Sequence, residues 1–151
     1  MTAAAGAVHH IRLTVTDVAR AREFYTRVLG FSVAVDTVPP QDDPDHWLMV
    51  YNLQGGIVLT NGQLQLGLRP CDDPRRRAGD RFDPRRVGLD HVSFSVGGRA
   101  ELAEIRDRCA AGGHEHGELA ELAPFGIAVL SITDPDGIQL ELTAPLEQDA
   151  R

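Results

Sequence analysis

The sequence contains no lysine, and all fifteen of its basic residues are arginine. Without a lysine amine the chain has no Schiff-base nucleophile, no P-loop lysine and no Ser–Lys dyad. Residues 1–8 form neither the basic region nor the apolar core of a secretory signal. No apolar run approaches the roughly 20 residues that are needed to span a bilayer. These absences exclude several enzyme mechanisms and predict a cytoplasmic protein with no membrane partner.

Cysteine is scarce, and acidic residues outnumber basic ones. Cys71 and Cys109 stand alone without a CxxC spacing, which favours two reduced thiols over a disulfide framework or a zinc ribbon. The net charge of −7 disfavours a nucleic-acid partner, because phosphate binding depends on an excess of basic residues. Seven arginines do gather between residues 69 and 88, but four aspartates are interleaved with them. That pattern is typical of a solvated linker.

The most informative feature that the sequence does contain is a repeat. The segment His10-Ile-Arg-Leu-Thr-Val15 returns as His91-Val-Ser-Phe-Ser-Val96, 81 residues further along the chain. Each copy alternates polar and apolar residues, which predicts a half-buried strand whose successive side chains point to opposite faces. Both histidines then lie on a polar face, at equivalent positions of two related halves.

The same order of elements follows each copy, a helix and then three strands. In the first half we expect a helix from Thr16-Asp17 to Gly30 and strands over 31–36, over 47–51 with a short continuation at 57–60, and over 63–66. In the second half we expect a helix that ends at Gly112-Gly113 and strands near 114–119, over 126–132 and over 139–142. The predicted fold class is α+β, a single domain over 1–151 with βαβββ modules at 8–68 and 89–144 and a linker at 69–88.

Four polar side chains could form one site. The last strands of the two halves end alike, so we interpret Gln65 and Glu141 as counterparts. If the halves pair about a pseudo-twofold axis, their polar faces line one cavity, and His10 and His91 lie beside these two residues. Two imidazoles, a carboxylate and an amide oxygen are suitable ligands for one divalent ion such as Fe, Mn, Zn, Ni or Co. A lone histidine on a strand is more often a surface residue, but the repeated context favours a ligand.

These motifs resemble those of the vicinal oxygen chelate superfamily, which includes glyoxalase I, extradiol dioxygenases, methylmalonyl-CoA epimerase and the fosfomycin and bleomycin resistance proteins. The resemblance spans about residues 8 to 144 and depends on the segments His10 to Asp17, Glu23 to Phe31, Gly88 to His91, and Asp134-Pro-Asp-Gly137 leading to Glu141. It implies two paired modules that form a curved mixed sheet around a central cavity, and a homodimer. It also implies that His10, Gln65, His91 and Glu141 bind the metal, with Glu141 as the catalytic residue.

The resemblance does not select one member of the superfamily. Gln65 argues against glyoxalase I, which usually has a glutamate on that strand. Epimerases match the four ligands but need a further carboxylate on the third strand, which we expect at 46–51 and which offers none. Fosfomycin transferases have a basic and tyrosine pattern near the C-terminus that is missing here. Extradiol dioxygenases are usually longer.

Other polar side chains on the same faces are candidates for binding a small-molecule substrate. They are Arg12, Thr14, Ser93 and Gln139, of which Arg12 would hold a carboxylate or phosphate. Simple solvation in a wet cleft is an equal alternative for each. His9 should point away from His10 and is assigned no role.

Two functions remain open at this stage. One is a metal enzyme, a lyase, isomerase or dioxygenase, that chelates a small oxygenated metabolite on a divalent metal, and the full ligand set favours it. The other is a protein similar to the bleomycin resistance proteins, which sequesters a small molecule without turnover. A scaffold that binds no ligand is a third possibility.

Overall fold

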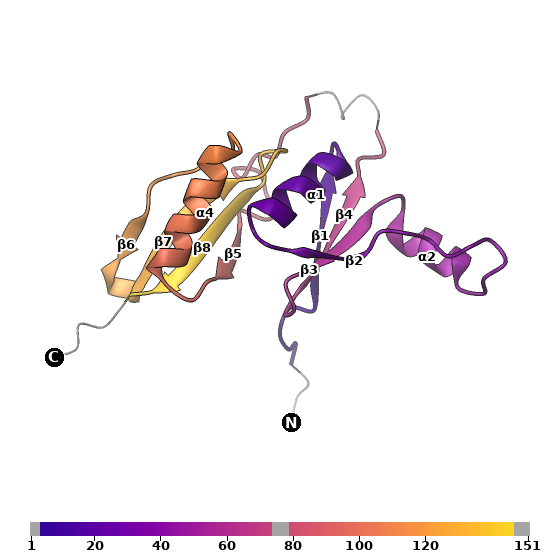
Figure 1. Ribbon diagram of the computed structural model, residues 1–151, viewed down its shortest axis with the longest axis horizontal. Helices are drawn as coiled ribbons and strands as arrows, with labels where there is room; N and C mark the ends of the chain where they lie inside the picture. The colour runs from indigo at the N-terminus through magenta and orange to yellow at the C-terminus, as the bar shows by residue number, and fades with distance from the viewer. Residues whose placement is uncertain (1–3, 74–78, 147–151) are drawn as a thin grey trace. The chain divides into compact units, whose positions relative to one another are not determined.

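The computed structural model describes residues 4–73 and 79–146, and the chain divides into two compact units (Figure 1). Of the described residues, 4–26, 30–73 and 79 belong to the first unit, and 27–29 and 80–146 belong to the second. Each unit contains a four-stranded mixed sheet with helices, so the fold is α+β and consists of two modules. None of the helices in the described ranges is long and apolar enough to cross a membrane.

The first unit has the strand order β1-β4-β3-β2. Its elements are β1 (His10–Val15), α1 (Val18–Arg27), β2 (Ser32–Val35), α2 (His46–Leu53), β3 (Ile57–Thr60) and β4 (Gln65–Pro70). β1 and β4 are parallel, whereas β3 pairs antiparallel with both β2 and β4. Parallel neighbours need a long crossover connection, and the helices and strands between β1 and β4 provide it.

The alternation in β1 sorts its side chains between two faces. Leu13 and Val15 are buried, whereas His10, Arg12 and Thr14 are exposed. The predicted strand, its bounds and its polar face are therefore confirmed. This face carries all the sequence-predicted binding residues of the first strand.

Helix α1 also follows the sequence prediction. Asp17 directly precedes it, and its carboxylate accepts a hydrogen bond of 3.0 Å from the backbone N–H of Arg20 and so caps the helix. Phe24 and Tyr25 on this helix are buried. Gly30 follows with a φ of +74°, a left-handed conformation that glycine adopts more readily than other residues.

The predicted strand over 47–51 is wrong, because these residues belong to helix α2. Five consecutive apolar residues have no period that separates a strand from a helix. The flanking signals favour the helix: the backbone N–H of Met49 donates to the carbonyl of Asp45, and Gln54 ends the helix in a left-handed conformation. The third strand is therefore β3, which has no carboxylate either, so the argument against an epimerase is unchanged.

The second unit has the strand order β5-β8-β7-β6. Its elements are β5 (Val92–Ser95), α4 (Arg99–Ala111), β6 (Ala120–Leu122), the short 3-10 helix η1 (Ala123–Phe125), β7 (Ile127–Thr133) and β8 (Gln139–Pro145). α4 packs on β7 and β8 and buries Leu102, Ile105 and Cys109, the three residues expected on its apolar side. β5 and β8 are parallel, as β1 and β4 are in the first unit.

Several predicted boundaries need correction. The strand expected over 91–96 is β5, which begins at Val92, so His91 directly precedes the strand. The strand expected near 114–119 is β6, which begins at Ala120, because the preceding segment forms only an isolated bridge from His116 to Ile132. The strand expected over 63–66 is β4, which begins at Gln65 and continues to Pro70. The expected linker at 69–88 therefore loses its first two residues to β4. Residues 74–78 of that linker lie outside the described residues.

Candidate metal-binding and ligand-binding site

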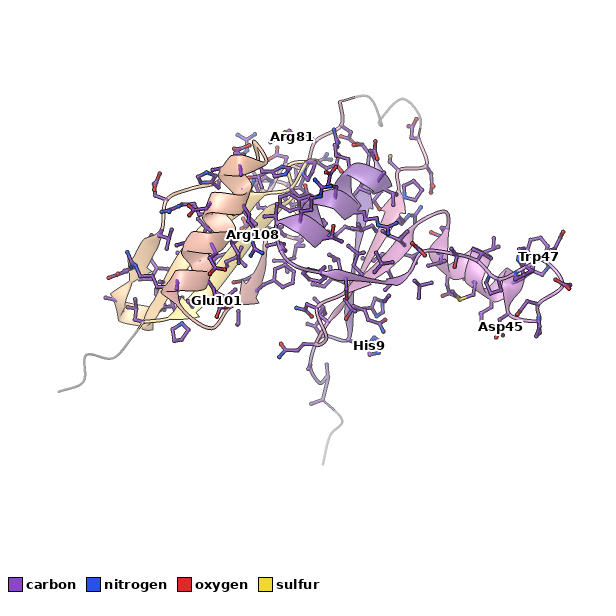
Figure 2. All side chains as sticks on the ribbon, viewed as in Figure 1. His9, Asp45, Trp47, Arg81, Glu101 and Arg108 are labelled. Carbon is purple, nitrogen blue, oxygen red and sulfur yellow. The ribbon has the colours of Figure 1, made fainter. Side chains whose placement is uncertain are left out.

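In the first unit, the two predicted metal ligands are direct neighbours. His10 on β1 is the register partner of Gln65 on β4. Adjacent strands lie about 4.8 Å apart, and both side chains are exposed, so an imidazole and an amide stand side by side on the polar face. The Nδ1 atom of His10 lies 3.0 Å from Nδ1 of His9. His9 precedes the first residue of β1, so the alternation that was expected to turn it away does not apply (Figure 2).

These residues lie at the edge of a cavity of about 340 Å³ within the first unit. Its polar lining consists of His9, His10, Arg12, Asn52 and Gln65. Its apolar lining consists of Val35, Met49, Leu53, Ile57 and Val58. The volume lies at the small end of the range for ligand pockets. Helix α2 supplies three of these residues, Met49, Asn52 and Leu53, and none of them is a sequence-predicted site residue, because a strand and no helix was expected over 47–51.

One row of side chains crosses all four strands of the first sheet at this cavity. Arg12 pairs in register with Gly67, Gly67 with Val58, and Val58 with Val35. An added Cβ on Gly67 would lie 3.1 Å from Cγ of Arg12, closer than ordinary van der Waals contact. The absent side chain at position 67 therefore lets the arginine stem lie across β4. The guanidinium donates a hydrogen bond to the carbonyl of Asn52 in the last turn of α2.

In the second unit, His91 is held by its neighbour in sequence. Its Nδ1 atom lies 2.6 Å from a carboxylate oxygen of Asp90, and both side chains are exposed. A histidine that donates one ring N–H to a carboxylate has its tautomer fixed, and its other nitrogen, Nε2, is then available to a metal. Asp90 is not among the sequence-predicted site residues.

Glu141 lies in a cluster with two hydroxyl groups. Ser93 Oγ lies 3.0 Å from Oε1 of Glu141, and Thr143 Oγ1 lies 3.2 Å from the same oxygen. The two hydroxyl oxygens are 2.8 Å apart. Ser93, a predicted substrate-binding residue, therefore contacts the predicted metal ligand directly. Its position on β5 opposite Glu141 on β8 follows from the parallel register.

The other two predicted substrate-binding residues differ in their surroundings. The side-chain amide of Gln139 lies 3.3 Å from both the hydroxyl of Thr133 and the carbonyl of Gly137. These bonds tie it to the hairpin between β7 and β8. Thr14 is exposed on the polar face of β1, two residues beyond Arg12.

The strand register does not make Gln65 the counterpart of Glu141. Arg12 pairs with Gly67, whereas Ser93, which is 81 residues further along and equivalent to Arg12, pairs with Glu141. The position equivalent to Glu141 is therefore Gly67. By the same register, Gln65 corresponds to Gln139, and each of them is the first residue after its hairpin. The first unit thus has its oxygen donor two residues earlier on the strand than the second unit.

Each unit contributes one imidazole and one oxygen donor on a polar face. Among residues 4–73 and 79–146, no three histidine, cysteine, aspartate or glutamate side chains are grouped closely enough to hold a metal ion. The donor chemistry nonetheless suits a divalent first-row ion, because His91 has a fixed tautomer and Glu141 has one oxygen held by hydroxyls.

Comparison with known proteins identifies the family. Residues 7–142 match the family described as Glyoxalase/Bleomycin resistance protein/Dioxygenase superfamily. The chain therefore belongs to this superfamily. The uncharacterized protein YaeR of Escherichia coli (strain K12) is 29% identical over 140 residues, which cover 89% of this chain and 93% of YaeR.

Solved structures share the fold. The glyoxylase/bleomycin resistance protein/dioxygenase domain from Frankia sp. EAN1pec is 25% identical, with a TM-score of 0.71, and the match covers 99% of this chain and 96% of that domain. Lactoylglutathione lyase from Agrobacterium tumefaciens is 22% identical, with a TM-score of 0.60, and the match covers 93% and 94% of the two chains. Similarity at this level establishes the common fold, and the reaction of the lyase is not transferred with it.

Proposed function

We propose that the protein is a metal-dependent enzyme that acts on a small oxygenated metabolite as a lyase, isomerase or dioxygenase. In this proposal His10 and Gln65 of the first unit and His91 and Glu141 of the second bind one divalent ion. Membership of the superfamily supports a divalent metal and a small-molecule substrate. The observation that carries the proposal is that His91 and Glu141, the two donors of the second unit, are both held in place by hydrogen-bonding neighbours.

The protein residues would divide the work as follows. Asp90 fixes the ring of His91, and the hydroxyls of Ser93 and Thr143 orient the carboxylate of Glu141. Arg12 would hold an anionic part of the substrate through its guanidinium. A divalent ion, when bound, supplies Lewis acidity toward substrate oxygens. Since Gln65 is neutral and Glu141 carries one negative charge, the ligand set would leave a dication with about one net positive charge.

Metal analysis of the wild type and three variants tests the ligand assignment. We expect about one Fe, Mn, Zn, Ni or Co per chain in protein purified without chelator, and loss of the metal and of turnover in Glu141→Ala and His91→Ala. Glu104 is exposed on α4, so Glu104→Ala is the matched control and should retain the metal. Full metal occupancy in Glu141→Ala would show that the assignment is wrong. Failure of the wild type to bind any of these ions after reconstitution would refute the enzyme proposal.

The second candidate function is binding without turnover, as in the bleomycin resistance proteins. It is favoured by one observation: the cavity belongs to the first unit alone and includes neither His91 nor Glu141. Ligand retention by metal-free protein, with no product formed after metal is restored, would select this alternative.

Two further expectations belong to the same proposal. We propose that the protein is a cytoplasmic homodimer, since members of the superfamily often dimerise. Light scattering coupled to size exclusion should give twice the 16.4 kDa chain mass. The mass of a single chain would contradict the dimer and leave the ligand assignment to the metal analysis.

A further inference from the structure

The cavity of the first unit has a charge that contrasts with the rest of the protein. The chain carries a net charge of −7, yet no aspartate or glutamate lines the cavity within the described residues. Its charged and titratable lining consists of the guanidinium of Arg12 and the imidazoles of His9 and His10. A cavity with a permanent cation and no carboxylate attracts an anion.

We propose that this cavity binds a small organic carboxylate with a short, branched or aromatic apolar body. This assignment rests on the proposed function, because it takes the cavity as the substrate site, and it adds the chemical class of the substrate. The carboxylate would pair with Arg12, and the apolar body would lie against the side chains contributed by β2, β3 and α2.

The geometry of Arg12 suits a carboxylate. A guanidinium has five N–H donors, which is more than the bond to Asn52 and the two bonds of a bidentate carboxylate require. The bond to Asn52 anchors the end of the side chain, and Gly67 provides the space in which its stem lies. Less side-chain freedom is then lost when an anion binds.

The position of α2 favours a single negative charge over two. Asn52 and Leu53 lie in the last turn of α2, where the unpaired carbonyl groups of a helix carry a partial negative charge. Arg12 offsets that charge through its bond to the carbonyl of Asn52. A phosphate dianion would be repelled more strongly by this helix end than a carboxylate monoanion.

The apolar lining and the volume limit the rest of the ligand. Val35 and Val58 are register partners in the row that contains Arg12, and Met49 and Leu53 are four residues apart on one side of α2. A volume of about 340 Å³ lies at the small end of the range for ligand pockets, so the ligand that fits is a small molecule.

Four compounds with one hydrocarbon body test the assignment by isothermal titration calorimetry. They are 4-methylpentanoate, its neutral amide, the corresponding primary amine, and 4-methylpentyl phosphate. We expect the carboxylate to bind at least about tenfold more tightly than the amide and the amine, since a hydrogen bond to a charged group is the stronger kind. Equal binding of the carboxylate and the amide would overturn the inference. Tighter binding of the phosphate would overturn the carboxylate assignment.

Variants then assign the binding to Arg12. Arg12→Gln should weaken carboxylate binding about tenfold or more and leave amide binding unchanged. Arg12→Lys keeps the positive charge but cannot form the two parallel hydrogen bonds of a guanidinium, so its carboxylate affinity should lie between those of the wild type and Arg12→Gln. Arg22 lies on α1 outside the cavity lining, so Arg22→Gln is the matched control. Unchanged carboxylate binding in a folded Arg12→Gln protein would overturn the inference. The comparison of carboxylate with amide in the wild type needs no variant and stands if Arg12→Gln fails to fold.

The same titration in metal-free wild-type protein and in His91→Ala separates this inference from the proposed function. His91 belongs to the second unit and is absent from the cavity lining, so carboxylate binding should persist within about threefold. Persistence together with a failed metal analysis would refute the enzyme proposal and support the binding site. If carboxylate binding is lost when the metal is removed, the cavity does not bind the carboxylate independently of the metal, and this inference is overturned. The metal proposal would stand.

Discussion

The cluster of the Ser93 and Thr143 hydroxyls with Glu141 yields a quantitative prediction. It has three oxygen–oxygen contacts, but the two hydroxyls have only two protons to donate. Ser93 and Thr143 each donate one hydrogen bond at a time. If one hydroxyl donates to Oε1 of Glu141, the other can donate to the first hydroxyl across the 2.8 Å contact. The carboxylate therefore keeps a donor when either hydroxyl is removed, and it loses both donors only in the double variant.

The magnitudes follow from this arrangement. A hydrogen bond to a charged group contributes about 1.5–3 kcal/mol, and the exposure of Ser93 places the loss in the double variant near 1.5 kcal/mol. That is about a tenfold loss of metal affinity, within the range for neighbours of metal ligands. Ser93→Ala and Thr143→Val alone should each cost only about two- to threefold, since the remaining hydroxyl takes over. The double variant should therefore cost more than the two single variants together.

Competition between the protein and a chromophoric chelator for Zn²⁺ or Ni²⁺ measures these affinities. Ser95→Ala is the matched control, because Ser95 lies on the same exposed face of β5 and pairs with Thr143 without a bond to Glu141. If either single variant bound the metal as weakly as the double variant, the two hydroxyls would not replace each other as donors to Glu141. If no variant changes metal affinity, Glu141 does not bind the metal.

Three shorter predictions concern stability and access. Gly56→Ala places a Cβ 2.0 Å from the carbonyl oxygen of Leu68, so chemical denaturation should show a loss of at least about 2 kcal/mol. Gly67→Ala should raise the midpoint of thermal unfolding slightly, since alanine suits a strand better than glycine, but weaken carboxylate binding by crowding Arg12. Burial raises the pKa of the Cys109 thiol to about 11, so the free energy of unfolding should fall as pH rises above the ordinary thiol pKa toward 11.

Each of these three has a control variant or an outcome that would contradict it. The added Cβ of Gly117→Ala meets only ordinary contacts, so this variant should be nearly as stable as the wild type. The sign for Cys109 follows from the unfolded chain, which releases the thiol proton at lower pH than the folded chain and is favoured once it does so. Cys109→Ala should flatten the alkaline decline, and an unchanged slope would show that other groups cause it. Unaltered ligand binding in Gly67→Ala would contradict the packing argument for Arg12.

Alternation and capping were sufficient to predict β1 and α1 from the sequence. Both signals are local: the alternation follows from the strand period, and Asp17 and Gly30 mark the helix ends by their own backbone chemistry. The run from Trp47 to Tyr51 has no such period, so it was assigned as a strand although it forms a helix. The helix is marked by the residues that flank the run, Asp45 before it and Gln54 after it.

The sequence predicts which single residues of the candidate site lie on polar faces, but it does not predict how the strands that carry them pair. The polar face of β1 and the position of Glu141 follow from alternation. The equivalence of Gln65 with Glu141 failed because it was inferred from similar strand endings, whereas the register aligns Gly67 with Glu141 and Gln65 with Gln139. Strand pairing depends on backbone hydrogen bonds across the sheet, and similar strand endings do not reveal it. The contribution of α2 to the cavity could not be predicted either, because residues 47–51 were expected to form a strand.

The register difference has a consequence for how such a protein could arise by duplication. A tandem copy of the first unit would carry two histidines and two glutamines as proposed ligands, with no formal charge. A tandem copy of the second would carry two histidines and two glutamates, with a charge of about −2 at neutral pH. Only the combination of Gln65 with Glu141 gives a charge of about −1. The net charge of the proposed ligand set thus depends on the difference between Gln65 and Glu141, and a tandem copy of either unit would not reproduce it.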